Sequence, residues 1–166
     1  MVMKNFDWTQ FKCRIPVEAP IDVLYDAWTI PSEIERWFLS DASFFNSEGN
    51  PTNKNDRIQE EDTCKWRWFL WDGIEEGKVT RVNGNDHIQF TFAGECLVDV
   101  HLEAYDKGTI VSISQSNIPT DEKSKQNIRL GCFSGWSFYI VNIKSIYEGG
   151  LDLRNKNVNL EMMTNT

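Results

Sequence analysis

The stretch HIQFTFAGECLVDVHLEAYDKGTIVSISQ, residues 87–115, decides the fold of this chain. Apolar and polar residues alternate in three successive runs, which are separated by turns at Ala93-Gly94 and Lys107-Gly108. Alternation with a period of two is typical of strands with one buried face, and short turns join antiparallel neighbours. The stretch therefore predicts an antiparallel meander with one apolar face.

The meander extends toward the N-terminus. Residues 64–71, CKWRWFLW, lead into the hairpin signal Asp72-Gly73, and residues 75–82 lead into Asn83-Gly84. A short strand at 42–45 comes before a polar loop at 46–62, which makes six predicted strands. Both faces of 64–71 carry rings, with Trp66 and Trp68 on one and Phe69 and Trp71 on the other, so alternation alone leaves the inward face open.

The first forty residues predict a further strand and two short helices. Residues 6–17 alternate and read as a half-buried strand. After Ala19, apolar residues recur at helical spacing until Pro31, and Ser32 is a candidate N-cap for a second helix.

A long helix is predicted near the C-terminus. Thr120 is its expected N-cap, and Gly149-Gly150 its expected stop. The intervening apolar stripe has helical spacing and consists of Ile128, Cys132, Phe133, Trp136, Tyr139, Ile140, Ile143 and Tyr147. Gly131 and Gly135 lie on this helix and indicate either close packing or an opening over a cavity. Residues 154–166 form a polar tail for which we expect no fixed packing.

These elements predict an α+β domain over residues 1–153. A curved antiparallel sheet of six to seven strands is wrapped on the long C-terminal helix, and two short helices follow the first strand. The helix should cover the concave face, because no other long element can bury the apolar side of the sheet.

Composition narrows the range of partners. The chain has 166 residues, with 25 acidic and 17 basic side chains and a net charge of −8. Such a surface repels phosphates and anionic lipid, so neither nucleic acid nor membrane insertion is expected. The opening residues 1–8 have no apolar core of the secretory kind, which predicts a cytoplasmic protein.

Four segments carry a family resemblance. They are APIDVLYDAWTIPSEIERWF at 19–38, KWRWFLWDG with EEGKV at 65–79, HIQFTF at 87–92 and GCFSGWSFYIVNIKSIYEGGLDLR at 131–154. In this order they resemble the helix-grip fold of the START-like (SRPBCC) superfamily, and in particular proteins related to the activator of heat-shock protein 90 ATPase. The resemblance spans nearly the whole chain.

The resemblance implies a mainly apolar cavity between sheet and helix, used in the superfamily for lipids, sterols, polyketides and similar molecules. It implies no single reaction, because one fold hosts many functions. Eukaryotic co-chaperones of the family have a separate N-terminal domain that engages the chaperone. This chain begins at the first helix-grip strand, so we do not expect that domain.

The sequence and the resemblance are therefore compatible with three functions. The leading one is a non-enzymatic domain, monomeric or homodimeric, that binds a small hydrophobic molecule and needs no cofactor. The second is a protein-interaction module that contacts a chaperone. The third, a cyclase or dehydratase, requires an acid/base pair inside the cavity, and the sequence offers no clear one.

No catalytic or metal site is predicted. Glu75 and Glu76 lie at a hairpin, where charge normally faces solvent. Asp99, His101 and Glu103 share a strand face, but side chains spread along one strand span too far for one ion unless His87 joins them across the sheet. The four cysteines are far apart in sequence and among apolar residues, so we expect buried, reduced thiols.

The predicted cavity wall combines large apolar side chains with a few polar ones. Rigid rings that converge between a helix and a curved sheet either fill the space or frame a void. Gln115 and the Tyr139 hydroxyl are the expected polar anchors. The full set of predicted ligand-binding residues is Trp28, Trp37, Trp66, Trp68, Phe90, Phe92, Gln115, Trp136, Tyr139 and Ile140.

Overall fold

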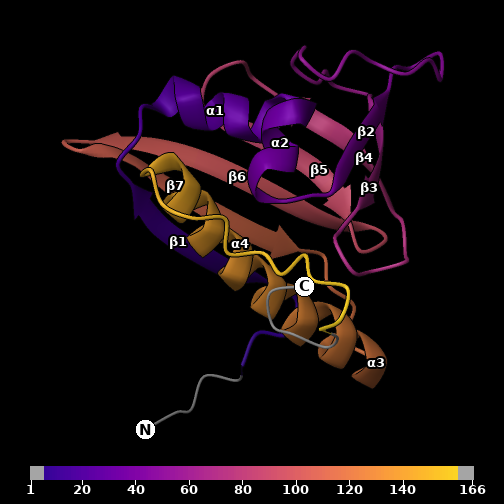
Figure 1. The fold of residues 1–166 in the computed structure, drawn as a ribbon. Coiled ribbons are helices and arrows are strands. Elements are labelled where there is room, and N and C mark those ends of the chain that lie inside the picture. Colours follow the sequence, from indigo (N-terminus) through magenta and orange to yellow (C-terminus); the bar gives the residue numbers. More distant parts are fainter. Residues whose placement is uncertain (1–5, 161–166) are drawn as a thin grey trace, which may run out of the picture.

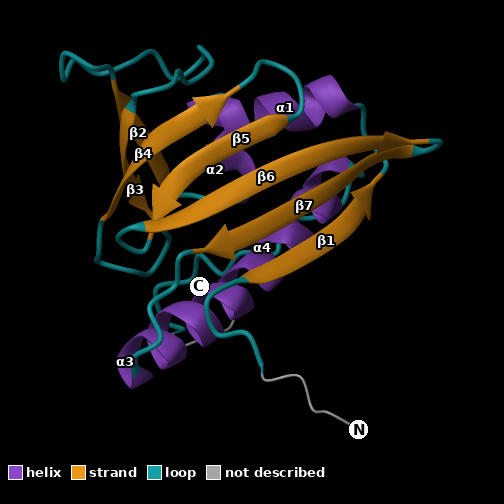
Figure 2. Cartoon of the chain, turned by 180° about the vertical axis from the view of Figure 1, so that it is seen from behind, coloured by secondary structure: helices purple, strands orange, loops and turns teal. Residues whose placement is uncertain are grey.

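A computed structural model describes residues 6–160, and its described helices lie on one side of an antiparallel sheet (Figures 1 and 2). The sheet has seven strands in the order β1-β7-β6-β5-β4-β3-β2. Their bounds are β1 Phe11–Val17, β2 Asp41–Phe45, β3 Thr63–Arg67, β4 Glu75–Val82, β5 His87–Phe92, β6 Cys96–Tyr105 and β7 Gly108–Ser116. The helices are α1 Ile21–Thr29, α2 Pro31–Trp37, α3 Glu122–Ser124, the π-helical turn η1 Lys125–Leu130, and α4 Gly131–Tyr147. This is the predicted α+β helix-grip architecture.

The meander buries the predicted apolar face in β6. In β6 the residues Cys96, Val98, Val100 and Leu102 are buried, and the residues between them are not. β1 closes the far edge by pairing with β7, so the first and last strands are neighbours. The sheet therefore presents one continuous apolar face to the helices.

Both predicted helix N-caps are wrong by one or two residues. Ile30, not Ser32, precedes α2, because Pro31 occupies the first helical turn, where its missing N–H costs nothing. Asp121, not Thr120, caps the C-terminal helical segment, since its carboxylate accepts a hydrogen bond from the Ser124 N–H at 3.0 Å. A carboxylate there also complements the helix dipole.

The sheet-facing side of α4 is mostly as predicted. Trp136, Tyr139, Ile140 and Ile143 are buried, and the Trp136 indole N–H donates to the Gln115 side-chain oxygen of β7 at 3.1 Å. Phe133 differs, because its side chain is 41% exposed and packs edge-on against Phe11 at the sheet margin. The fully buried positions of α4 thus begin at Trp136, whereas Ile128 and Cys132 are only partly buried where they pack against the core.

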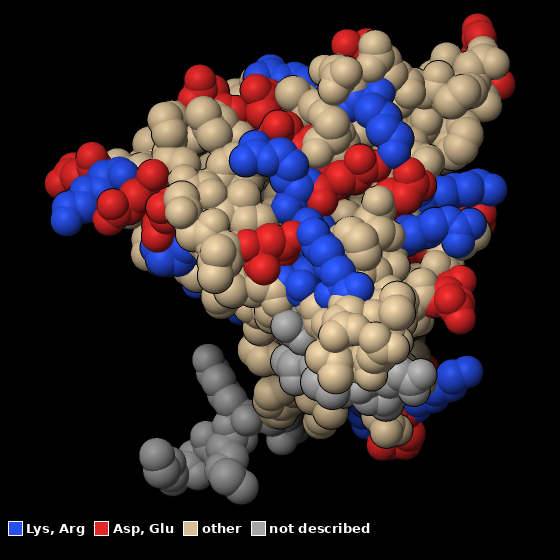
Figure 3. All heavy atoms as spheres, in the orientation of Figure 1, with Lys and Arg blue, Asp and Glu red and all other residues tan. Residues whose placement is uncertain are grey.

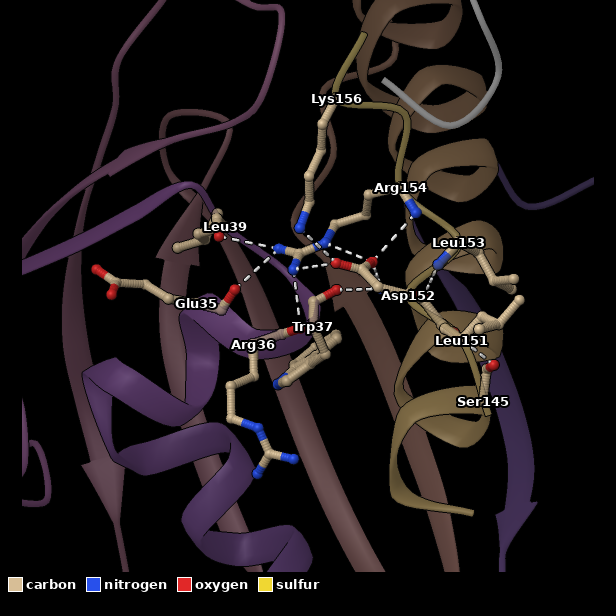
Figure 4. Close-up of polar contacts among 11 residues, drawn as sticks. Glu35, Arg36, Trp37, Leu39, Ser145, Leu151, Asp152, Leu153, Arg154 and Lys156 are labelled. Carbon is tan, nitrogen blue, oxygen red and sulfur yellow. Dashed lines mark hydrogen bonds and ion pairs between the residues drawn. The ribbon is translucent and has the colours of Figure 1, made fainter. Parts of the chain in front are cut away.

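The chain beyond α4 folds back onto the domain through Arg154 (Figure 4). The Arg154 guanidinium is buried and donates to the carbonyl oxygens of Glu35, Arg36 and Leu39, and to the Asp152 carboxylate. Sequence reasoning assigned Arg154 to a polar tail without fixed packing. The structure gives Arg154 a packed position, while residues 161–166 of that tail lie outside the described residues.

All four cysteines are free thiols in the structure. Cys64 and Cys96 are buried as predicted. Cys13 and Cys132 are only half-buried, so the prediction of burial is wrong for these two. Cys13 lies near the margin, with its sulfur 3.6 Å from the Ser137 hydroxyl, and Cys132 lies on the first turn of α4.

Replacing Trp136 with alanine should lower the free energy of unfolding by about 3–5 kcal/mol, the range for a large aromatic side chain removed from a core. The loss also leaves the Gln115 side-chain oxygen without its donor. Urea denaturation of both proteins measures the difference. Trp71→Ala is the matched control, because that ring is 50% exposed and should cost much less. Equal midpoints for wild type and Trp136→Ala would contradict the helix register described here.

Candidate functional site

A cavity of about 470 Å³ lies between the N-terminal half of α4 and the loop that joins β3 to β4. It opens to solvent and is lined by thirteen residues, which come from the end of α2, the β3–β4 loop, β4, β5 and the turn after it, η1 and α4. The aromatic members of the lining are Phe38, Trp68, Trp71, Phe92, Trp136 and Tyr139. Leu70, Ala93 and Cys132 add apolar surface, and Glu75 and Asn127 add polar groups.

Two glycines keep the helix side of the cavity open. A Cβ atom added to Gly135 would meet no atom within 4 Å, and one added to Gly131 would meet only the Gln126 carbonyl oxygen, at 3.8 Å. Both residues line the cavity. Of the two interpretations open from sequence, the structure therefore supports the opening over a cavity, not close packing.

The π-helical turn η1 completes this end of the wall. It extends from Lys125 to Leu130 and places Asn127 on the cavity, while Arg129 on its other side lies over the rings of Phe6 and Phe11. Single π-helical turns within α-helices are frequent at functional sites.

The structure shows which aromatic side chains of residues 64–71 face the cavity. β3 ends at Arg67 rather than Trp71, and Leu70 adopts a left-handed backbone conformation with φ of 59°. The chain therefore turns after Trp68, and Trp68 and Trp71 both reach the cavity. Their ring centroids are 5.4 Å apart with planes at 73°. Phe69 points away from the cavity and lies under Arg154 and Lys156.

Glu75 is the charged side chain of the lining. It pairs in register with buried Trp66, and residues paired across antiparallel strands point to the same face, so Glu75 faces the helix side. Its carboxylate accepts a hydrogen bond from the Ala93 N–H at 2.6 Å. Burial raises the pKa of this carboxyl above its usual value, and the Ala93 hydrogen bond only partly opposes the rise. The prediction of a solvated charge is wrong for Glu75, although neighbouring Glu76 is exposed.

The structure separates the ten predicted ligand-binding residues into groups. Trp68, Phe92, Trp136 and Tyr139 line the large cavity. Trp28, Trp66 and Phe90 instead surround an enclosed space of about 10 Å³, which is barely room for one water molecule. Trp37 and Ile140 are core residues, and Gln115 is buried with its side-chain oxygen bonded to Trp136.

Sequence reasoning missed several lining residues. Phe38 follows a helix end, Leu70 and Trp71 follow a strand end, and Asn127 lies in a π-turn that no periodicity marks. The one available signal was at Gly131 and Gly135, because two glycines in a helix weaken it and so require a structural reason.

The outer face of the sheet holds a polar cluster formed by His87, Asp99 and His101. His87 and His101 are paired across β5 and β6, with parallel rings 4.1 Å apart. The His87 Nε2 lies 2.7 Å from an Asp99 carboxylate oxygen. The ligand atoms of His87, Asp99 and His101 all lie within 4.8 Å of one another. His87 therefore does join the strand residues across the sheet, and the distance argument against a metal site fails for this trio.

Charge on the visible surface is mixed. On the face seen in Figure 3, Lys and Arg side chains are interspersed with Asp and Glu, and no broad basic field is present there. None of the described helices is long and apolar enough to cross a membrane.

The seven-stranded sheet, the grip of α4 and the cavity beneath it define a START-like helix-grip domain. A family model described as activator of Hsp90 ATPase homolog 1-like protein matches residues 18–148. The chain belongs to this family.

Several solved structures share the fold. The protein SSP2350 from Staphylococcus saprophyticus is 20% identical, with a TM-score of 0.68, and the match covers 87% of this chain and 96% of that one. An Aha1 dimer from Colwellia psychrerythraea is 20% identical, with a TM-score of 0.65 and coverage of 85% and 97%. DynU16, from the dynemicin biosynthetic locus, is 19% identical, with a TM-score of 0.68 and coverage of 89% and 50%. No curated protein sequence matches the chain.

Replacing Glu75 with glutamine should stabilise the free protein at neutral pH. The folded state raises the pKa of the carboxyl, so ionisation above its unfolded pKa destabilises the fold. Glutamine removes this charge and can still accept the Ala93 hydrogen bond. The gain in melting temperature should be present at pH 7 and should shrink below about pH 4, where the carboxyl is protonated in both states. Thermal unfolding of Glu75→Gln and Glu76→Gln at both pH values tests this, and equal shifts for the two variants would contradict it.

Proposed function

We propose that this protein is a non-enzymatic cytoplasmic domain that binds a small molecule with a large apolar part, such as a lipid-, sterol- or polyketide-like compound. The observation that carries the proposal is the open cavity beneath α4, with a volume of about 470 Å³. Ligand pockets are usually about 300–1,000 Å³ and mostly apolar with a few polar groups, a description that fits this one.

The chemistry of the lining supports binding rather than catalysis. Burial raises the pKa of the Cys132 thiol to about 11 and that of the Tyr139 hydroxyl to about 12, so both stay protonated at neutral pH. A protonated thiol is a poor nucleophile. Glu75 remains as an acid or base, but the cavity lining supplies no second ionisable group of suitable pKa for it to work with.

A protein-interaction role is the second candidate, and the cavity mouth gives it a specific basis. Leu70, Trp71 and Ile74 of the β3–β4 loop are all substantially exposed. Exposed apolar side chains of this kind mark either an entrance for an apolar ligand or a contact for a protein such as a chaperone or a second copy. The two roles differ in their response to filling the cavity, because a surface contact does not need its interior.

Filling the cavity should abolish binding of an uncharged apolar probe. N-phenyl-1-naphthylamine should bind the wild type with a micromolar dissociation constant and quench tryptophan fluorescence, since tryptophans line the cavity. Gly135→Leu places a side chain into the space where an added Cβ meets nothing, and we expect it to weaken binding at least about tenfold, or about 1.4 kcal/mol.

Ser134→Leu is the matched control, because Ser134 is an exposed neighbour on α4 that does not line the cavity. It should bind the probe like the wild type. Equal affinities for wild type and Gly135→Leu, with both proteins folded by circular dichroism, would refute ligand binding in this cavity and leave the protein-interaction role.

A further inference from the structure

We propose that the ligand is an organic cation, an apolar body bearing an amine or quaternary ammonium group that lies against Glu75. This inference rests on the proposed function and names the ligand class of the same cavity. It follows from the charge of the lining, from the arrangement of its rings and from the charge of the whole chain.

Within the part of the chain that the structure describes, the Glu75 carboxylate has no cationic partner. No Lys or Arg lines the cavity, and among residues 6–160 no ion pair involves Glu75. Its neighbour Glu76 shows the usual arrangement, because it is exposed and pairs with Lys65 at 3.2 Å. A half-buried carboxylate without a counter-ion is unfavourable, and proteins keep such groups where a ligand or a reaction uses them. A ligand cation would supply the missing charge.

The aromatic rings that line the cavity with Glu75 suit a cation. Trp68 stands edge-to-face with both Trp71 and Phe92, with ring planes at 73° and 72° and centroids 5.4 and 6.2 Å apart. Aromatic rings set at nearly right angles form the walls of a box, and the negative faces of such rings attract ammonium groups. Trp136, which is 5.3 Å from Phe92 between ring centroids, adds a further wall.

The net charge of the chain also favours a cationic ligand. A net charge of −8 attracts cations to the protein and repels carboxylate or phosphate ligands. A fatty acid would also bring a second carboxylate toward Glu75. A protonated apolar amine is attracted by the net negative charge and brings no second carboxylate toward Glu75.

Three ligands that differ only in their head group test this proposal: decyltrimethylammonium, decanol and decanoate, each below its micellar concentration. Isothermal titration should show that the ammonium binds about tenfold tighter than the alcohol, and that decanoate binds weakest. Glu75→Gln should remove the advantage of the ammonium over the alcohol, whereas Glu76→Gln should preserve it.

The proposal is overturned if wild type binds decanol as tightly as the ammonium, or if Glu75→Gln keeps the preference. A loss of decanol affinity in Glu75→Gln would also overturn it, since it would mean that a protonated Glu75 donates a hydrogen bond to a neutral ligand. Failure of all three ligands and of N-phenyl-1-naphthylamine would instead refute the cavity as a binding site. The titrations thus distinguish a wrong ligand class from a cavity that binds no ligand.

A second inference rests on the opposite face of the sheet and is independent of the cavity. The geometry of His87, Asp99 and His101 points to a site for a divalent transition-metal ion such as Zn²⁺. Tetrahedral Zn²⁺ with bonds of about 2.0–2.1 Å holds its ligand atoms about 3.3 Å apart. The three ligand atoms here already lie within 4.8 Å, so small side-chain rotations bring them to one ion.

The surroundings are compatible with such an ion. The Gln89 side-chain N–H donates to Asp99 at 2.9 Å and orients that carboxylate, and Thr80 in turn donates to Gln89. Asp99 is thus held in place by a hydrogen bond, as metal-binding carboxylates usually are.

Titration of untagged protein with Zn²⁺ should give one site with a micromolar or lower dissociation constant. His101→Gln should weaken binding at least about tenfold, comparable with the loss of a supporting residue at known metal sites. Glu103→Gln is the matched control, because Glu103 is two residues along β6 and pairs with Arg14 instead. The inference fails if the wild type shows no saturable Zn²⁺ binding below 100 µM, or if the two variants bind Zn²⁺ equally.

Discussion

The buried side-chain amide of Asn142 holds three distant segments of the chain together. Its N–H₂ group donates to the Trp37 carbonyl oxygen at the end of α2 at 2.6 Å, and its oxygen accepts from the Leu153 N–H at 2.8 Å. Arg154 extends the same junction by donating to three carbonyl oxygens from residues 35–39. A fully bonded polar network of this kind specifies one arrangement, since any shift leaves buried groups unpaired. The C-terminal half of α4 is thereby fixed against α2.

The cavity follows from this one-sided attachment. From Trp136 onward, α4 packs on the sheet and is bonded to α2, whereas the preceding turns contain two glycines, a π-turn and a phenylalanine that is 41% exposed. Neither glycine supplies a side chain to fill the space at that end, where an added Cβ atom would meet at most one atom within 4 Å. Phe69, held beneath Arg154, fixes the loop that carries Trp68 and Trp71 across the opening. The C-terminal half of α4 therefore stabilises the fold, and its N-terminal half borders the open cavity.

The fold was predictable from sequence, and the site only in part. The alternation over residues 87–115 and the helical stripe around Trp136 arise because each element buries one face, which places apolar residues at a regular spacing. The cavity residues that the sequence did not predict follow no such spacing. Leu70 and Trp71 depend on a left-handed residue after a strand end, and Asn127 depends on a π-turn, so neither position has a period to follow. Glu75 was read as solvated because hairpin charges usually are, and only the register with Trp66 shows that it faces inward. Arg154 begins a polar, Asn-rich segment and so reads as part of the tail, and its main partners are backbone carbonyls, which no sequence pattern marks.

The central claim is that the cavity beneath α4 takes up an apolar ligand. Fluorine NMR of protein labelled with 5-fluorotryptophan tests it most directly, because the chain has seven tryptophans and the cavity is lined by three of them. Single Trp→Phe variants assign the resonances. N-phenyl-1-naphthylamine should shift the signals of Trp68, Trp71 and Trp136 and leave unchanged that of Trp8, which lies against Lys125 outside the cavity. Saturable shifts confined to tryptophans outside the lining, or no shifts at all, would contradict the account.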